Sequence, residues 1–140
     1  MSDEGEEGNC VSKEREMVTK IRIIVEDVKL EAELFDTPCA HGIAGLLPIE
    51  AIPNVWGDEF YFEINLEQGL DQTATTDVEV GDIGFWPPGR ALAIFFGPTP
   101  MSSGSKPVPA SAVNLVGRIT HDAALLRGVK GAARLRIEAA

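Results

Sequence analysis

Two tryptophans and a group of phenylalanines are the residues of this chain whose types best suit ligand binding. Residues 81–100, GDIGFWPPGRALAIFFGPTP, contain four of the nine aromatic residues and four of the nine prolines. Ligand pockets are mostly apolar, with a few polar groups that orient the ligand. Trp56, Trp86 and Phe95 are therefore candidates to line a groove for an apolar or proline-bearing ligand. Phe96 is a fourth candidate. The alternative is that these rings fill the core, because large aromatic side chains dominate buried area.

Two arginines and one asparagine are the polar candidates for such a site. Arg90 follows PPG, and Arg118 lies in VGRI. Either guanidinium could recognise a carboxylate or a carbonyl group, since it offers five hydrogen-bond donors. The alternative for both arginines is a surface ion pair with the acidic half of the chain, and such pairs are individually weak. For Asn114 the alternative to a binding role is an internal hydrogen bond.

Metal and nucleophile chemistry have little support in the sequence. Cys39 and His41 are spaced too closely to define a metal site by themselves, and His121 is a lone histidine expected to be structural or solvated. The chain has no GxSxG elbow, no Ser-His-Asp order and no phosphate-binding loop. No catalytic residue is assigned, and we expect neither a metal nor a cofactor. Cys10 and Cys39 are expected to be free thiols.

Short strands must position these residues. Residues 20–26 and 30–36 alternate apolar and polar side chains, and the EDVK segment between them predicts a tight turn, so they are expected to form a hairpin. Residues 36–47 predict a helix that is capped by Asp36 or Thr37 and ends before Pro48.

The aromatic segment predicts a second hairpin. Its strands are 83–86 and 91–96, and Pro88 and Gly89 suit the central positions of a type II turn. Both faces of 91–96 are apolar, which is typical of a strand that is buried on both sides or lines a pocket. The long loop that follows, residues 97–111, is a candidate lid.

The remaining segments complete a mainly β fold. Strands are expected within 52–66, 112–119 and 132–140, with a short helix over 120–128. Asp58 and Glu59 are adjacent, so on a strand they face opposite ways and are not expected to form a paired-carboxylate site. Seven or eight short strands with two short helices predict a closed antiparallel eight-stranded barrel.

Length and charge define the domain and exclude some partners. The 140 residues suit one domain, with an acidic disordered tail over 1–16 and the barrel over 17–140. The net charge is −10, and residues 31–89 contain twelve acids and no Lys or Arg, which disfavours nucleic acid binding. No apolar run is long enough for a membrane helix, and we expect a cytoplasmic protein. Five bases from Arg118 onward are expected to complement the acidic half of the fold or a partner subunit.

Three segments carry a resemblance to a known family. WGDEFYFEI, GDIGFWPPGRALAIFFGPTP and VNLVGRI together resemble small prokaryotic cyclophilin-like proteins, over about residues 20–140. The resemblance implies an eight-stranded cyclophilin-type β-barrel capped by helices. The FHR…QGGD motifs of prolyl isomerases are absent from this sequence, so their catalytic residues cannot be transferred to it. Other cyclophilin-like barrels resemble subunits of amide-hydrolysing or oxoprolinase-type complexes.

Three functions follow as hypotheses. The first is a barrel that binds a small molecule or a proline-bearing peptide without isomerase activity, at a site near Trp86, Arg90 and Phe95. The second is a degenerate peptidyl-prolyl isomerase that uses Arg90 or Arg118 as the donor to the amide. The third is an interaction subunit, either of a homo-oligomer or of a complex with another protein.

Overall fold

The protein is a mainly antiparallel β structure with short helices, seen here as a computed structural model that describes residues 18–140. The predicted tail over 1–16 and Cys10 lie outside the described residues. The strands are β1 (Thr19–Val25), β2 (Val28–Leu34), β3 (Ile49–Ala51), β4 (Asn54–Val55), β5 (Glu59–Glu63), β6 (Ala74–Thr75), β7 (Asp82–Trp86), β8 (Ala91–Phe95), β9 (Val113–Ile119) and β10 (Leu135–Ala139). The helices are α2 (Pro38–Ala44) and the 3-10 segments η1 (Pro87–Gly89) and η2 (Ala123–Val129).

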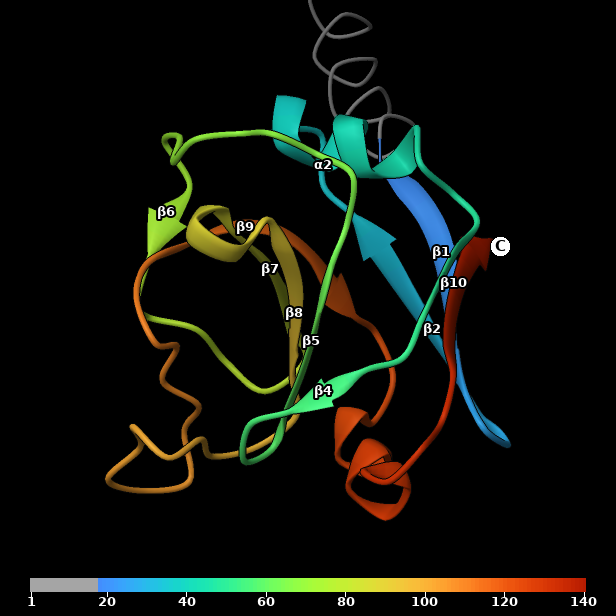
Figure 1. Cartoon of the computed structure of the whole chain (residues 1–140), viewed down its shortest axis with the longest axis vertical. Helices are drawn as coiled ribbons and strands as arrows, with labels where there is room; N and C mark the ends of the chain where they lie inside the picture. Colours follow the sequence, from blue (N-terminus) through green and yellow to red (C-terminus); the bar gives the residue numbers. More distant parts are fainter. Residues whose placement is uncertain (1–17) are drawn as a thin grey trace, which may run out of the picture.

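All strands belong to one sheet that curls around the core (Figure 1). Its order is β3-β10-β1-β2-β9-β7-β8-β5-β4, and β6 pairs with β9 off this path. Only Ile52 and Pro53 separate β3 from β4, so the two ends of the path meet at that corner of the chain. The mainly β, antiparallel fold is as predicted. The structure describes ten strands rather than the predicted eight, and three of them, β3, β4 and β6, have only two or three residues.

The predicted first hairpin forms, but its turn is shorter than predicted and β2 begins at Val28 rather than at Leu30. β1 and β2 pair from Thr19–Leu34 to Val25–Val28, which leaves a two-residue turn at Glu26 and Asp27. Glu26 has a φ of 56°, the left-handed conformation that such short turns demand. The buried residues alternate along both strands, so the hairpin presents one apolar face to the interior.

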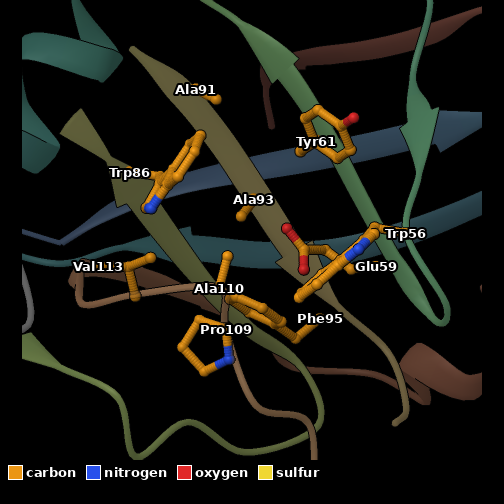
Figure 2. A pocket seen from close by; sticks show the side chains of 10 residues that line it. All are labelled: Trp56, Glu59, Tyr61, Trp86, Ala91, Ala93, Phe95, Pro109, Ala110 and Val113. Atoms are coloured by element: carbon orange, nitrogen blue, oxygen red, sulfur yellow. The ribbon is translucent and has the colours of Figure 1, made fainter. Parts of the chain in front are cut away.

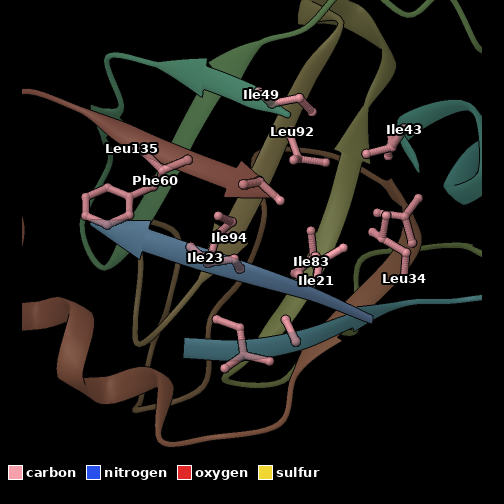
Figure 3. Packing of buried hydrophobic residues seen from close by; sticks show 14 of the residues in the cluster. Ile21, Ile23, Leu34, Ile43, Ile49, Phe60, Ile83, Leu92, Ile94 and Leu135 are labelled. Carbon is pink, nitrogen blue, oxygen red and sulfur yellow. The ribbon is translucent and has the colours of Figure 1, made fainter. Parts of the chain in front are cut away.

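Alternating residues of the strands fill a single main core (Figure 3). Ile21, Ile23, Leu92, Ile94 and Leu135 are all almost completely buried in it. Burial of such a side chain contributes about 1.5–3 kcal/mol. α2 begins where the sequence predicts, because the Thr37 hydroxyl accepts a hydrogen bond from Ala40 N at 3.2 Å. It ends at Ala44, three residues before the predicted end.

The turn between β7 and β8 differs from the predicted type II turn. Pro87, Pro88 and Gly89 form a 3-10 turn, and Arg90 N donates to Pro87 O at 3.0 Å. The left-handed residue is Arg90, with a φ of 47°, rather than Gly89. Two consecutive prolines hold φ near −65°, which suits a helical turn. The left-handed residue that reverses the chain therefore comes one position later than predicted, at Arg90.

The helices do not approach the dimensions of a membrane span. Within residues 18–140, no helix is long and apolar enough to cross a bilayer. In Figure 1, α2 lies at one end of the curled sheet and η2 lies at the opposite end.

Candidate functional site

A pocket lies on the outer face of the sheet, opposite the main core (Figure 2). It is a cavity of about 220 Å³. The residues that line it come from the β4–β5 turn, β5, β7, β8, the loop after β8 and β9: Trp56, Glu59, Tyr61, Trp86, Ala91, Ala93, Phe95, Pro109, Ala110 and Val113. Aromatic and small apolar side chains predominate, and Glu59 is the one acidic residue among them.

Strand alternation explains why the pocket forms on this face. Ala91, Ala93 and Phe95 project outward from β8, while the residues between them enter the main core. Ala93 and Phe95 pack with Val78 and Val113 in a second, smaller cluster beneath the pocket. β8 is therefore buried on both faces, as its apolar sequence predicts. Phe95 itself has no exposed surface, so it serves as both core and pocket floor.

Trp86 is held in place from two sides. Its indole Nε1 donates to the Ser111 hydroxyl at 2.7 Å, which ties the ring to the loop after β8. On the other side, a Cβ added to Gly89 would lie 2.8 Å from Cζ3 of the indole. Only a residue without a side chain allows the turn to approach the ring so closely.

The loop over 97–111 forms one wall of the pocket through Pro109 and Ala110. Side-chain hydrogen bonds shape the loop: the Ser102 hydroxyl donates to Lys106 O at 2.7 Å and accepts from Thr99 N at 2.9 Å. Lys106 also pairs with Glu79 at 3.1 Å, which fixes the loop to the segment before β7. The loop thus contributes two residues directly to the pocket lining.

Glu59 has an unusual environment for a carboxyl group. The residue is 7 % exposed, and its Oε1 is buried without a hydrogen-bond partner among the described residues. Burial raises the pKa of Glu59 to about 8 from an ordinary value of 4.5. Burial therefore favours the neutral, protonated form of this carboxyl group. Carboxyl groups with such raised pKa values are concentrated at functional sites.

Of the residues predicted for a site, the structure brings three together. Trp56, Trp86 and Phe95 line the same pocket although they come from separate segments of the chain. Phe96 points the other way into the main core, where its ring centroid lies 4.8 Å from that of Phe60. Whether the pocket residues bind a ligand stays a prediction.

The polar candidates lie outside this pocket. Arg90 pairs with Glu63 at 2.6 Å and with Glu67 at 3.5 Å. Arg118 Nε lies 3.6 Å from Asp82 Oδ1. Both arginines thus take part in ion pairs within the chain, the alternative that the acidic composition suggested.

Asn114 is completely buried beside the pocket rather than in it. Its side-chain oxygen accepts from Asp71 N at 2.9 Å, and its nitrogen donates to Gly69 O at 2.9 Å and contacts Cys39 Sγ at 3.8 Å. These bonds fasten the segment before β6 to β9. Cys39 is a buried free thiol, and burial raises its pKa.

Each histidine forms one polar contact within the chain. His41 Nε2 lies 2.6 Å from Asp36 Oδ1, and His121 Nδ1 accepts from Glu31 N at 3.3 Å. No group of three His, Cys, Asp or Glu residues suited to a metal ion occurs in the described part of the chain.

Glu59 and Tyr61 were not among the candidates from the sequence. The alternation over 59–63 puts both on the face opposite Phe60 and Phe62. Residues 91–96 pair with this segment and are apolar on both faces. An apolar outer face indicates that other residues cover the sheet at this point. Sequence alone did not indicate that the two strands are neighbours.

Chemically, the pocket offers apolar and aromatic walls with one carboxyl group. In its neutral form the carboxyl group donates and accepts hydrogen bonds, and in its ionised form it balances a positive charge. Such a site suits the binding of a small, largely apolar ligand that carries one polar or charged group.

Comparisons with known proteins agree with this architecture. The model of the family described as Cyclophilin-like matches residues 19–138. The solution structure of a hypothetical protein from Archaeoglobus fulgidus is similar, with a TM-score of 0.73 and 37 % sequence identity over 89 % of this chain and 96 % of that one. No curated protein matched the chain. Since the family model covers nearly all of the described residues, the chain belongs to the cyclophilin-like family.

Proposed function

We propose that this cyclophilin-like protein is a binding module, and that a small molecule or a short proline-bearing peptide occupies the aromatic pocket. The observation that carries the proposal is the convergence of Trp56, Trp86 and Phe95 around a cavity of about 220 Å³. Pockets for drug-sized ligands have volumes of about 300–1,000 Å³, so this cavity suits a smaller ligand or one side chain of a peptide.

The loop over 97–111 acts in this proposal as a lid. Pro109 and Ala110 form the wall that would have to move, and the Trp86–Ser111 hydrogen bond fastens that wall to the sheet. A single side-chain hydrogen bond is worth about 0.5–1.5 kcal/mol, which thermal motion breaks readily. The proposed ligand therefore enters by displacing Ser111 from Trp86.

The two alternative functions have less support. A degenerate prolyl isomerase would need Arg90 or Arg118 near the bound amide, yet both pair with carboxylates outside the pocket. An interaction subunit would need its basic C-terminal surface free for an acidic partner. Arg127 and Lys130 instead pair with Asp58, and Arg136 pairs with Glu50 at 2.6 Å.

Tryptophan fluorescence and amide NMR shifts test the proposal, with proline peptides and small metabolites as titrants. We expect saturable shifts at Trp56, Trp86 and residues 107–113, and a loss of binding in Trp86→Ala. Trp86→Phe keeps an aromatic ring, so it is the conservative variant that shows whether a loss of binding in Trp86→Ala comes from a folding defect. Leu125→Ala removes an exposed apolar side chain away from the pocket and should bind normally. A Trp86→Ala variant that binds an identified ligand as well as the parent does would refute this placement.

A further inference from the structure

We propose that the pocket selects a small organic cation, an amine or a methylated ammonium group, with Glu59 as its counter-ion and Trp56, Tyr61 and Trp86 as its aromatic walls. This inference rests on the proposed function and names the class of ligand. It starts from one unexplained feature, the buried Glu59 Oε1 that has no partner among the described residues.

The geometry of the walls suits a cation. Figure 2 shows Trp56 and Trp86 on different sides of the pocket, Tyr61 along its rim, and the Glu59 carboxyl group directed into the space between them. Aromatic faces carry negative potential and attract ammonium groups, and three or more rings around one site form the cages that bind methylated amines. The cavity of about 220 Å³ suits a head group of that size.

Glu59 adds the charge that such a site requires. A neutral apolar ligand would cover the carboxyl group and leave Oε1 without a partner, which is unfavourable for a buried polar atom. A cation instead supplies a hydrogen-bond donor or an opposite charge. The opposite charge lowers the pKa of Glu59, so its proton leaves to solvent as the cation enters.

No other titratable group competes for this role within the lining. Tyr61 from β5 is the other titratable residue that faces the pocket, and its hydroxyl can donate or accept a hydrogen bond. The turn before β5 contributes Trp56, and β7 and β9 contribute Trp86 and Val113. The residues from β8 and the loop are all non-titratable: Ala91, Ala93, Phe95, Pro109 and Ala110.

The neighbouring acid does not offer an alternative anion. Asp58 is paired with Arg127 at 3.0 Å and with Lys130 at 2.8 Å, outside the pocket lining. The whole chain adds a favourable long-range field, because its net charge is −10. A protein with such a charge attracts small cations and repels anions.

Choline and its neutral carbon isostere, 3,3-dimethylbutan-1-ol, form the matched pair that tests the proposal. Both are titrated by NMR and calorimetry into the parent, Glu59→Gln and Glu63→Gln, and butylammonium extends the test to primary amines. Glu63 is an exposed acid on the same strand, so its variant is the control. We expect the parent to prefer a cation over the neutral isostere by about tenfold or more, Glu63→Gln to retain this preference, and Glu59→Gln to lose it.

Proton linkage gives a second readout. Calorimetry at pH 7 in two buffers of different ionisation enthalpy should report the release of close to one proton per cation bound. Affinity for choline should rise by up to about tenfold per pH unit below the pKa of Glu59. No proton release, or equal binding of choline and the isostere, overturns the proposal.

The failure of this inference is distinguishable from the failure of the binding function. If both cations leave Trp56 and Trp86 unperturbed while a proline peptide or a neutral metabolite shifts them, the cation assignment is wrong and the pocket still binds. If every titrant is silent, both proposals fail.

Discussion

Asp58 and Glu59 are adjacent in the chain, yet their carboxyl groups have opposite environments. Asp58 accepts a hydrogen bond from Lys130 Nζ at 2.8 Å and forms an ion pair with Arg127 Nε at 3.0 Å, whereas Oε1 of Glu59 is buried without a partner among the described residues. Successive residues of an extended chain point to opposite sides, so one acid reaches η2 and the other reaches the pocket. The first acid fastens the fold, and the second has an unpaired oxygen at the pocket.

Stability should depend on pH through Glu59. Its pKa is raised by burial to about 8 in the folded protein, against 4.5 when it is exposed. Between these values the folded state binds the proton and the unfolded state does not, so stability falls as pH rises. The contribution of protonated Glu59 to stability is complete below pH 4.5 and is lost above about pH 8. We expect the free energy of unfolding in urea to fall by up to about 1 kcal/mol per pH unit across this interval, relative to Glu59→Gln.

The comparison with Glu59→Gln isolates this titration from those of other groups, and Glu63→Gln controls for the loss of a carboxylate on the same strand. Glu63→Gln should follow the pH profile of the parent. Parallel profiles for the parent and Glu59→Gln would mean that the carboxyl group is not desolvated in solution.

Asp58→Asn should weaken the attachment of η2. The substitution removes the charge that Arg127 and Lys130 share, on a side chain that is only 16 % exposed. Because hydrogen bonds to charged groups are stronger than neutral ones but both cations are partly solvated, we expect a loss of about 1–2 kcal/mol. Urea denaturation measures the loss, and hydrogen exchange should show lower protection over Ala123–Val129.

Glu50→Gln is the matched control, since Glu50 pairs with Arg136 on an exposed surface. It should cost less than about 1 kcal/mol. Equal losses in the two variants would argue against a special role for Asp58.

Asn114→Ala should destabilise the protein strongly. Asn114 is fully buried and satisfies both Asp71 N and Gly69 O. Each buried polar group left without a partner costs about 1–3 kcal/mol, so we expect about 2–4 kcal/mol in thermal or urea unfolding. Asn54→Ala removes an exposed amide that donates to Tyr61 O at 3.1 Å, and it should cost much less. A small effect of Asn114→Ala would indicate that water replaces the amide.

Gly89→Ala should disturb the pocket more than the fold. The added Cβ would lie 2.8–2.9 Å from the Trp86 ring, so the indole must shift away from its bond with Ser111. We expect a changed Trp86 indole resonance, faster exchange of its N–H, and a destabilisation of about 1 kcal/mol. Gly104→Ala, with no atom near its added Cβ, is the control and should leave the Trp86 signals unchanged.

The local features of this fold were accessible from sequence. The hairpin of β1 and β2 depends on alternation and a short turn, and both are encoded within a few residues. The apolar sequence of residues 91–96 indicated a strand that is buried on both faces or lines a pocket. The resemblance carried by residues 81–100 indicated the fold family.

The environments of individual side chains required the tertiary structure. Glu59 has an ordinary strand sequence around it, and its raised pKa comes from burial in a pocket whose other lining residues, such as Phe95 and Ala110, are distant in the chain. For Arg90 the sequence allowed either a ligand or an ion pair with an acid, and the fold places Glu63 of β5 beside it. Alternation is a property of the backbone, so the sequence determined which residues share a face. Desolvation and charge pairing are properties of contacts between distant segments, so only the fold decided which of these faces became a pocket.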